Sequence, residues 1–316
     1  MTTEIINFQT EQEWLDLRKK DITSTDIAAL FGLSPYKTEF ELYHEKLDGN
    51  GAAFKSNERM RWGNRLESAI AYGAAEEHGF NVQPLKVYMR QPNIRIGSSF
   101  DFEILSEQHG KGIMEIKNVD GLIYRRNWTD DGNGNIEAPE HIELQVQHQM
   151  EVSGHEYCAI VALVGGNTTK IAYRRRDPEI GKAIRDRVEQ FWGRVKAKEA
   201  PSADYVRDAD LIAQLYSQVN KGELVDTKDD DVLANLVELY REAKLSQSHF
   251  EKMADGLKAR ILERVKTAEK IISPFGSISL GMVKDTPPKL ITADMVGTSV
   301  GGRAGYRSFK FTPVKQ

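Results

Sequence analysis

The hydrophobic pattern of the chain changes its period near residue 80, and this change limits the folds that the sequence can adopt. Over residues 60–77 apolar side chains recur every four positions, as in an amphipathic helix, and Gly79 ends the pattern. The segments 82–90, 94–104 and 112–119 instead have β-branched residues in near alternation, which is typical of strands. These three strands suggest a meander.

The segments on either side follow the same two periods. Residues 10–48 look mostly helical, a helix is expected over 139–153, two strands over 157–164 and 170–175, and a closing helix over 179–198. The order of helices, strands, helix, strands and helix predicts an α/β (α+β) fold with a central mixed β-sheet flanked by helices.

The character of the sequence shifts after Pro201, and we expect two domains, residues 1–201 and 202–316. The second would be a helical C-terminal extension with a long helix over about 230–270 and short strands such as 306–311. Alternating steps of four and three mark one seam on this helix, formed by Leu236, Tyr240, Ala243, Gln247, Phe250, Ala254, Leu257 and Ile261. The seam predicts packing against another helix, in this chain or in a partner.

The composition is that of an ordinary globular protein, with 40 % hydrophobic and 28 % charged residues among 316. The formal net charge of -4 gives no overall signature of a nucleic-acid binder, but acidic metal ligands and a basic groove cancel in such a sum. The N-terminus has no basic stretch before an apolar one, and no run approaches the roughly 18 apolar residues of a membrane span. We therefore expect a cytoplasmic protein without a membrane partner.

The sequence contains one cysteine, Cys158, which limits its metal chemistry. A single thiol cannot form an internal disulfide, a four-thiolate zinc site or an iron–sulfur cluster. Because Cys158 lies in an apolar strand segment, we expect it to be a small buried side chain.

The most informative segment is Glu115-Ile116-Lys117, which Asp101 precedes. Side chains alternate faces along a strand, so Glu115 and Lys117 point one way and Ile116 the other. If the two strands pair, Asp101 reaches the same edge, and the converging carboxylates suit Mg²⁺ or Mn²⁺ equally. Lys117 would orient the attacking water or stabilise the transition state. Taken alone, alternating Glu and Lys are also common on a solvated edge strand.

The triad is one of four short blocks along the chain. They are Trp14, Arg18, 22–27 and 32–36; Met60, Trp62, Gly63 and Glu67; Asp101 with 115–117; and Gln145, Val146, Gln147 and Met150. In order and spacing they resemble the lambda-exonuclease/YqaJ family of viral recombination nucleases, part of the PD-(D/E)XK superfamily. The resemblance spans residues 14–200 and implies a restriction-endonuclease-like core.

The resemblance also implies roles for the matching residues. The catalytic set would be Asp101, Glu115, Lys117, Glu67 and Gln145. The metal ligands would be Asp101, Glu115, Glu67 and the backbone carbonyl of Ile116, and the metal Mg²⁺, with Mn²⁺ as the alternative. Gln145 would help to position water or substrate.

A second group of residues corresponds to the grip on the terminal 5′ phosphate. Arg18 and Thr25 match the family residues with this role, and the adjacent Ser24 could substitute. A guanidinium and a hydroxyl at a helix N-terminus suit an anion.

Two arginine-rich segments are candidate DNA contacts. Arg125 and Arg126 lie between Tyr124 and Trp128, so this segment offers both phosphate neutralisation and base stacking. The triplet 174–176 is the second. Ordinary surface arginines would explain either segment equally well.

The chain departs from the family pattern around Asp101. The family usually has Pro before this Asp and often Gly after it, whereas here Phe100 and Phe102 flank the carboxylate. We expect the chemistry to be retained, with a different local turn.

Several conspicuous residues have simpler interpretations. We expect Trp14 and Trp62 to be core anchors. Gln145, His148 and Gln149 share a helix face, and such a polar face normally meets solvent, so His148 is left out of the predicted site.

The leading functional hypothesis is a 5′→3′ exonuclease that degrades linear double-stranded DNA from its ends and leaves 3′ single strands for phage-type recombination. By resemblance, its partners would be a single-strand annealing protein and further copies of itself in a ring-like trimer, in a bacterial host cytoplasm if the gene is phage or prophage encoded. One alternative is a structure-specific or endo-acting nuclease of the same fold. The other is a catalytically inactive DNA-binding or assembly protein.

Overall fold

The chain forms two compact units, Met1–Val219 and Asn220–Gln316, in a computed structural model. The structure describes residues 2–48, 57–106, 110–218 and 220–285, and the short segments 289–290, 299–300, 306–307 and 310–313. Helix α8 (Ala209–Leu215) belongs to the first unit, although it lies beyond the expected domain boundary at residue 201. The boundary at residue 201 stays a prediction.

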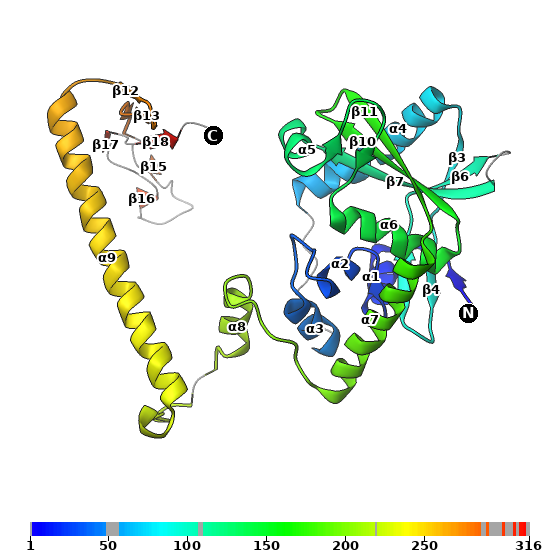
Figure 1. The fold of residues 1–316 in the computed structure, drawn as a ribbon, viewed down its shortest axis with the longest axis horizontal. Helices are drawn as coiled ribbons and strands as arrows, with labels where there is room; N and C mark the ends of the chain where they lie inside the picture. Colours follow the sequence, from blue (N-terminus) through cyan, green and yellow to red (C-terminus); the bar gives the residue numbers. More distant parts are fainter. Residues whose placement is uncertain are drawn as a thin grey trace. The chain divides into compact units, whose positions relative to one another are not determined.

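A five-stranded mixed sheet forms the centre of the first unit (Figure 1). Its strands, in spatial order, are β11 (Thr168–Arg175), β10 (Tyr157–Val164), β7 (Gly110–Val119), β6 (Phe102–Ser106) and β3 (Asn81–Pro84). The β7–β10 pair is parallel and the other three pairs are antiparallel. The predicted α/β fold with a central mixed sheet and a helical C-terminal extension is confirmed.

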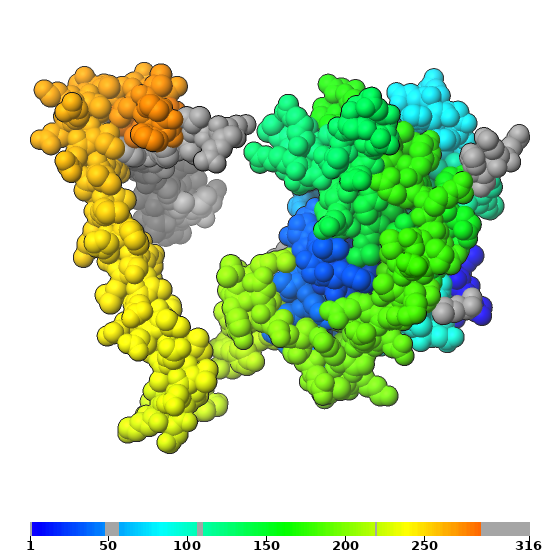
Figure 2. All heavy atoms as spheres, viewed as in Figure 1, coloured from blue at the N-terminus to red at the C-terminus, as the bar shows by residue number. Residues whose placement is uncertain are grey.

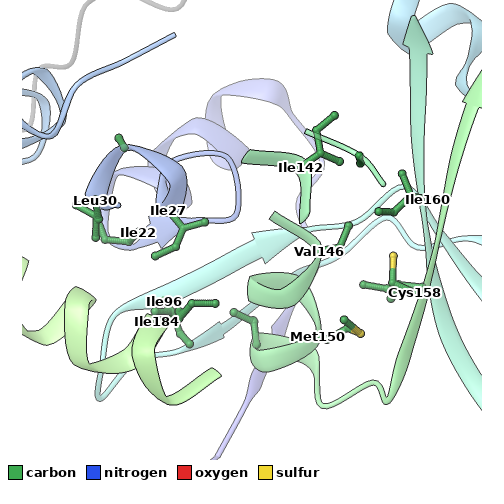
Figure 3. Close-up of a cluster of buried hydrophobic side chains, with 14 of the residues drawn as sticks. Ile22, Ile27, Leu30, Ile96, Ile142, Val146, Met150, Cys158, Ile160 and Ile184 are labelled. Atoms are coloured by element: carbon green, nitrogen blue, oxygen red, sulfur yellow. The ribbon is translucent and has the colours of Figure 1, made fainter. Parts of the chain in front are cut away.

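Helices cover both faces of this sheet. Helix α4 (Glu58–His78) packs Ile70 and Ala74 against Met114 and Val161 on one face. Helix α6 (Glu140–Ser153) packs on the other face, where the alternate strand residues lie. Figure 3 shows the second core, with α6 contributing Ile142, Val146 and Met150 and β10 contributing Cys158 and Ile160. Cys158 is fully buried, as expected.

The remaining helices of the first unit lie at its N-terminus and after β11. They are α1 (Glu11–Lys19), α2 (Ile27–Leu30), α3 (Glu39–Asp48) and α7 (Pro178–Ala197). Asp177 caps the start of α7 by accepting hydrogen bonds from two backbone N–H groups, and Gly79 and Gly154 end α4 and α6 in the left-handed conformation. These helices agree with the sequence pattern. Helix α5 (Gly121–Asn127) and the small hairpin β8 (Thr129–Asp130) and β9 (Ile136–Glu137) were not expected.

The expected meander is wrong, because the chain divides its strands between two sheets. A second sheet has the order β1 (Glu4–Ile6), β4 (Tyr88–Gln91), β5 (Ile96–Ser99) and β2 (Ile22–Thr23). Its strands β4 and β5 take part of the predicted strands 82–90 and 94–104, and β3 and β6, from the same two segments, belong to the five-stranded sheet. The break between β5 and β6 falls at Phe100 and Asp101. Phe100 enters the core beneath α6, and Phe102 enters the core beneath α4. In a continuous strand these two side chains would share one face, so the break serves both cores.

The second unit contains a short 3-10 helix, η1 (Thr227–Asp229), and the long helix α9 (Asp231–Val265), yellow in Figure 2. No residue of α9 is buried, and the seam residues Leu236, Tyr240 and Phe250 are all more than half exposed. The partner expected for the seam stays a prediction. Short strands follow: β12 (Lys270–Ser273), β13 (Gly276–Ser279), β14 (Met282–Val283), β15 (Lys289–Leu290), β16 (Ser299–Val300), β17 (Tyr306–Arg307) and β18 (Lys310–Pro313). The expected strand 306–311 falls on β17 and β18 and partly outside the described residues.

Among the helices that the structure describes, none combines the length and apolar character that a membrane crossing requires.

Candidate active site

The start of β6 and the middle of β7 bring Asp101 and Glu115 to one region of the sheet. Phe102 pairs with Met114 at the first position of β6, so Asp101 lies just before the paired segment. Its carboxylate Oδ2 accepts a hydrogen bond of 2.8 Å from the backbone N–H of Ile116. This bond fixes Asp101 at the point where the chain enters the central sheet.

Glu115 and Lys117 project together from β7 toward α6, while Ile116 packs in the opposite core with α4. The Lys117 Nζ donates to Glu115 Oε1 at 2.6 Å and to Gln145 Oε1 at 3.1 Å. The Gln145 Nε2 donates to the same Glu115 oxygen at 2.6 Å. The sequence-predicted Glu115, Lys117 and Gln145 therefore form one hydrogen-bonded cluster.

Gln149 also belongs to this cluster, although it was absent from the predicted site. Its Nε2 donates to Glu115 Oε2 at 2.7 Å, so both oxygens of Glu115 are held by side chains of α6. The signal was the spacing, because Gln149 lies one helical turn after Gln145. The expectation that this polar face meets solvent is wrong: Gln145, His148 and Gln149 are all buried.

Burial, together with charge repulsion, raises the pKa of two acidic residues of the cluster. Burial and the negative charges of Glu115 and Glu67 hold the pKa of Asp101 well above its usual value. Burial and the charge of Glu115 also raise the pKa of Glu67, which projects from α4. Burial alone would lower the pKa of Lys117, but the charge and hydrogen bond of Glu115 raise it. Three carboxylates thus lie close enough to influence one another, with the Lys117 ammonium beside Glu115.

The donor set suits a hard divalent cation, which would relieve this repulsion. Carboxylate oxygens are the preferred ligands of Mg²⁺ and Mn²⁺. Ile116 lies beyond the last β6–β7 pair, Phe102 with Met114, and its backbone N–H donates to the Asp101 carboxylate, so the Ile116 backbone lies next to this carboxylate. Within the described residues, no group of three or more His, Cys, Asp or Glu side chains is already gathered as a metal site.

The residues expected at the 5′ phosphate lie around β2. The Arg18 Nη2 donates to Thr25 Oγ1 at 2.8 Å, and the guanidinium lies 4.6 Å from the centre of the Trp14 ring. Ser24 is buried, and its hydroxyl accepts a bond of 2.9 Å from Ser98. Arg18 and Thr25 therefore form the accessible pair, while Ser24 faces the interior.

Asp26 anchors the turn that carries Thr25, a role that the sequence did not reveal. Its Oδ2 accepts hydrogen bonds from the backbone and hydroxyl of Thr23, at 3.2 and 2.8 Å, and it pairs with Lys46 at 3.3 Å and Lys37 at 3.6 Å. Burial would raise the pKa of Asp26, but the two lysines hold it far below its usual range. Asp26 directly precedes α2, but its side chain makes no capping bond to that helix.

Arg125 and Arg126 are exposed on α5, where a DNA backbone can reach them. The neighbouring aromatic residues have a different role: Tyr124 and Trp128 are buried and stack on each other, with ring centres 5.2 Å apart. The expectation that they stack on bases is wrong, because helical spacing turns them into the core.

Within the triplet 174–176, two arginines make ion pairs inside the fold. Arg174 pairs with Glu143 at 2.7 Å, and Arg176 pairs with Glu151 at 3.5 Å. These partners favour a structural role for both arginines over contact with DNA.

The two tryptophans of the matching blocks differ in burial. Trp14 is partly buried and donates its Nε1 to Ser99 Oγ at 2.8 Å. Trp62 is 48 % exposed, and the Arg65 guanidinium lies 5.1 Å from its ring centre. The expected core position of Trp62 is wrong, since α4 turns this side chain outward.

Comparison with protein families identifies the segment that carries the site. Residues 13–156 match the model of the YqaJ-like viral recombinase domain. This segment therefore resembles a YqaJ-like viral recombinase domain. The expected family is thereby confirmed, and all ten predicted side chains, from Arg18 to Gln145, lie within the YqaJ-like domain.

Individual relatives extend the similarity beyond this domain. The chain is 28 % identical over 264 residues to the uncharacterized protein YqaJ of Bacillus subtilis (strain 168), covering 81 % of this chain and 79 % of the relative. It also resembles the crystal structure of an alkaline exonuclease, LHK-Exo, from Laribacter hongkongensis. The identity is 19 %, the match covers 65 % of this chain and 99 % of that chain, and the TM-score is 0.48. A phage-related exonuclease from Haemophilus somnus 129PT shares 13 % identity over 56 % of this chain and 96 % of its own, with a TM-score of 0.40.

Proposed function

We propose that the protein is a divalent-metal-dependent exonuclease that degrades linear double-stranded DNA in the 5′→3′ direction and leaves 3′ single strands for recombination. The observation that carries this proposal is the meeting of Asp101, Glu115, Lys117 and Gln145 at the start of β6 and the middle of β7. The match of residues 13–156 to the YqaJ-like viral recombinase domain supports it.

The acidic residues would hold the metal. Asp101 and Glu115 would be the central ligands, with Glu67 and the Ile116 carbonyl completing the set. When bound, Mg²⁺, or Mn²⁺, lowers the pKa of water and offsets the charge of the phosphodiester.

The chain's own polar groups would orient the reaction. Lys117, released from part of its contact with Glu115, would direct its ammonium toward the attacking water or the developing charge on phosphorus. Gln145 and Gln149 would keep Glu115 in place while Lys117 moves, because each donates to a different oxygen of the Glu115 carboxylate. Buried partners of this kind limit the reorganisation that the reaction requires.

A second set of groups would select the DNA end. The Arg18 guanidinium and Thr25 hydroxyl present donors suited to a terminal 5′ phosphate. The exposed Arg125 and Arg126 would neutralise backbone phosphates without reading sequence. An enzyme with both contacts starts at a phosphorylated end and accepts any base.

The family resemblance extends the proposal to the cellular setting. We propose action in a bacterial cytoplasm, together with a single-strand annealing protein and as a homo-oligomer, with a ring-like trimer as the specific form. The second unit, residues 220–316, would supply such contacts. Size measurement in solution and co-purification with the annealing protein test these two points directly.

Release of nucleotides from DNA tests the central proposal. Wild type should degrade linear duplex in Mg²⁺ and stop in chelator, and Lys117→Ala should lower the rate by about 100-fold or more. Lys111→Ala is the matched control, because Lys111 lies on the same strand and pairs with Glu103 outside the cluster. Equal, negligible release by wild type and Lys117→Ala would establish the alternative of an inactive DNA-binding protein. Cutting of closed circular duplex would instead establish an endo-acting nuclease.

A further inference from the structure

An exposed aromatic residue contacts the helix that carries Gln145 and Gln149. Tyr36, in the loop between α2 and α3, is 83 % exposed, and its ring meets the His141 ring edge-on, with centres 5.8 Å apart. His141 is partly buried in the first turn of α6, one turn before Gln145. A large side chain so exposed contributes little to the core, so its position needs another explanation.

The Tyr36 and His141 pair lies one helical turn from Gln145, whose Oε1 accepts a hydrogen bond of 3.1 Å from Lys117 Nζ. Burial lowers the pKa of His141, and the positive charge of Lys117 lowers it further. Tyr36 is also among the groups that act on Lys117, after burial, Glu115 and Asp101. The Lys117 side chain retains 24 % exposure, so the cluster is accessible from outside.

The same loop is connected to the proposed phosphate grip. Lys37, the next residue after Tyr36, pairs with Asp26 at 3.6 Å. The Thr23 hydroxyl lies 2.8 Å from Asp26 and 3.1 Å from the Thr25 hydroxyl, which Arg18 contacts. The loop of Tyr36 is therefore linked to Thr25 through Lys37, Asp26 and Thr23. The Tyr36 ring itself contacts His141 on α6.

An exonuclease that removes the terminal nucleotide must hold two phosphates at once. The 5′ phosphate of that nucleotide would lie at Arg18 and Thr25, and its 3′ phosphodiester would lie at Lys117 and the metal. The sugar and base between these phosphates remain to be held. An aromatic ring suits this task because every base has a face that stacks, so the contact does not depend on sequence.

We propose that Tyr36, positioned by His141, stacks on the terminal 5′ nucleotide and holds it between the phosphate grip and the catalytic cluster. The proposal rests on the proposed nuclease function and assigns a nucleobase contact to residues outside the predicted site. His141 acts through Tyr36 as a positioning residue.

Substrates with and without the terminal base provide the test. On 5′-phosphorylated linear duplex, Tyr36→Ala should lower kcat/KM by about tenfold, within the range for loss of one stacked base, and Tyr36→Phe should stay near wild type. On the same duplex with an abasic terminal nucleotide, wild type should fall to the rate of Tyr36→Ala. Tyr205→Ala is the matched control, since Tyr205 is equally exposed, at 81 %, in a loop before α8.

A binding measurement separates stacking from a general loss of structure. In chelator, 2-aminopurine at the terminal 5′ position should be quenched by wild type and Tyr36→Phe and should remain bright with Tyr36→Ala. His141→Ala should weaken the quenching in part, and the double variant should lose less than the two single losses combined, because the rings act as a unit.

Three results would overturn the inference. Tyr36→Ala could match wild type on the natural end, or it could lose the same factor on natural and abasic ends, or the quenching could survive in Tyr36→Ala. Each of these leaves wild-type nuclease activity intact and so leaves the proposed function standing. A wild type that releases no nucleotides from any end removes both proposals together.

Discussion

Gln149 donates a hydrogen bond of 2.7 Å to the Glu115 oxygen that Lys117 and Gln145 do not contact. The carboxylate is thus held from both sides by one face of α6. A strand residue alone could rotate about its side-chain bonds, whereas Glu115 has a fixed orientation in a buried environment. The precision of the candidate active site comes from this helix as much as from the strand that bears the carboxylate.

Removal of this contact should reduce activity more than it reduces stability. In Gln149→Ala, one Glu115 oxygen loses its buried donor, and nuclease activity should fall by about tenfold while the free energy of unfolding falls by about 1–3 kcal/mol. Gln147→Ala is the control, because Gln147 is buried on the same helix but bonds to the backbone of Arg175 and Asp177. Initial rates and urea unfolding compare the two. If both variants lose the same activity for each kcal/mol of unfolding free energy lost, Gln149 has no specific role in the active site.

Neutralising Asp101 should stabilise the metal-free protein while abolishing activity. Burial and the charges of Glu115 and Glu67 disfavour the ionised Asp101, and Asp101→Asn removes that repulsion while its oxygen can still accept from Ile116. The melting temperature in chelator should rise by about 2–4 °C for each kcal/mol gained. Mg²⁺ or Mn²⁺ should raise the melting temperature of wild type but not of the variant. A lower melting temperature of Asp101→Asn in chelator would refute the repulsion.

His148 should make the stability of the first unit depend on pH. Burial lowers its pKa to about 4 from the ordinary 6.5, so the folded protein keeps the ring neutral while the unfolded chain takes up a proton below pH 6.5. The stability that depends on neutral His148 is therefore fully present above pH 6.5. As the pH falls toward 4, the free energy of unfolding decreases by at most about 3 kcal/mol.

His148→Gln isolates this contribution, since glutamine can still bond to the Ile22 carbonyl, which His148 Nε2 approaches at 3.2 Å. Urea unfolding of wild type and variant at pH 7, 6, 5 and 4.5 should give a stability difference that shifts in favour of the variant with acidity. A difference that stays constant across this range would mean that another group titrates.

The preference for a phosphorylated end should depend on Arg18. Wild type should degrade duplex with a 5′ phosphate faster than duplex with a 5′ hydroxyl, and Arg18→Ala should bring the two rates together by slowing the first. Lys19→Ala is the control, because Lys19 is the next residue but pairs with Asp16 on the surface. If Arg18→Ala slows both substrates by the same factor, the arginine supports the fold or the catalytic cluster instead of gripping the phosphate.

Local patterns in the sequence determined much of this protein. The period of the apolar residues predicted α4, α6, α7 and the paired strands β10 and β11, because burial of one face requires that period whatever the neighbours are. The alternation of Glu115, Ile116 and Lys117 likewise predicted which side chains share a face. Spacing alone did not distinguish a solvated edge from a catalytic cluster, and the four blocks supplied that distinction.

The tertiary structure decided the rest. Phe100 and Phe102 appear in the sequence as one strand, and only the competition of two cores for two aromatic rings breaks that strand at Asp101. Gln149 looks like a solvent-facing amide until β7 brings Glu115 beneath it. Contacts between residues distant in sequence depend on packing that no local period encodes, and the candidate active site consists almost entirely of such contacts.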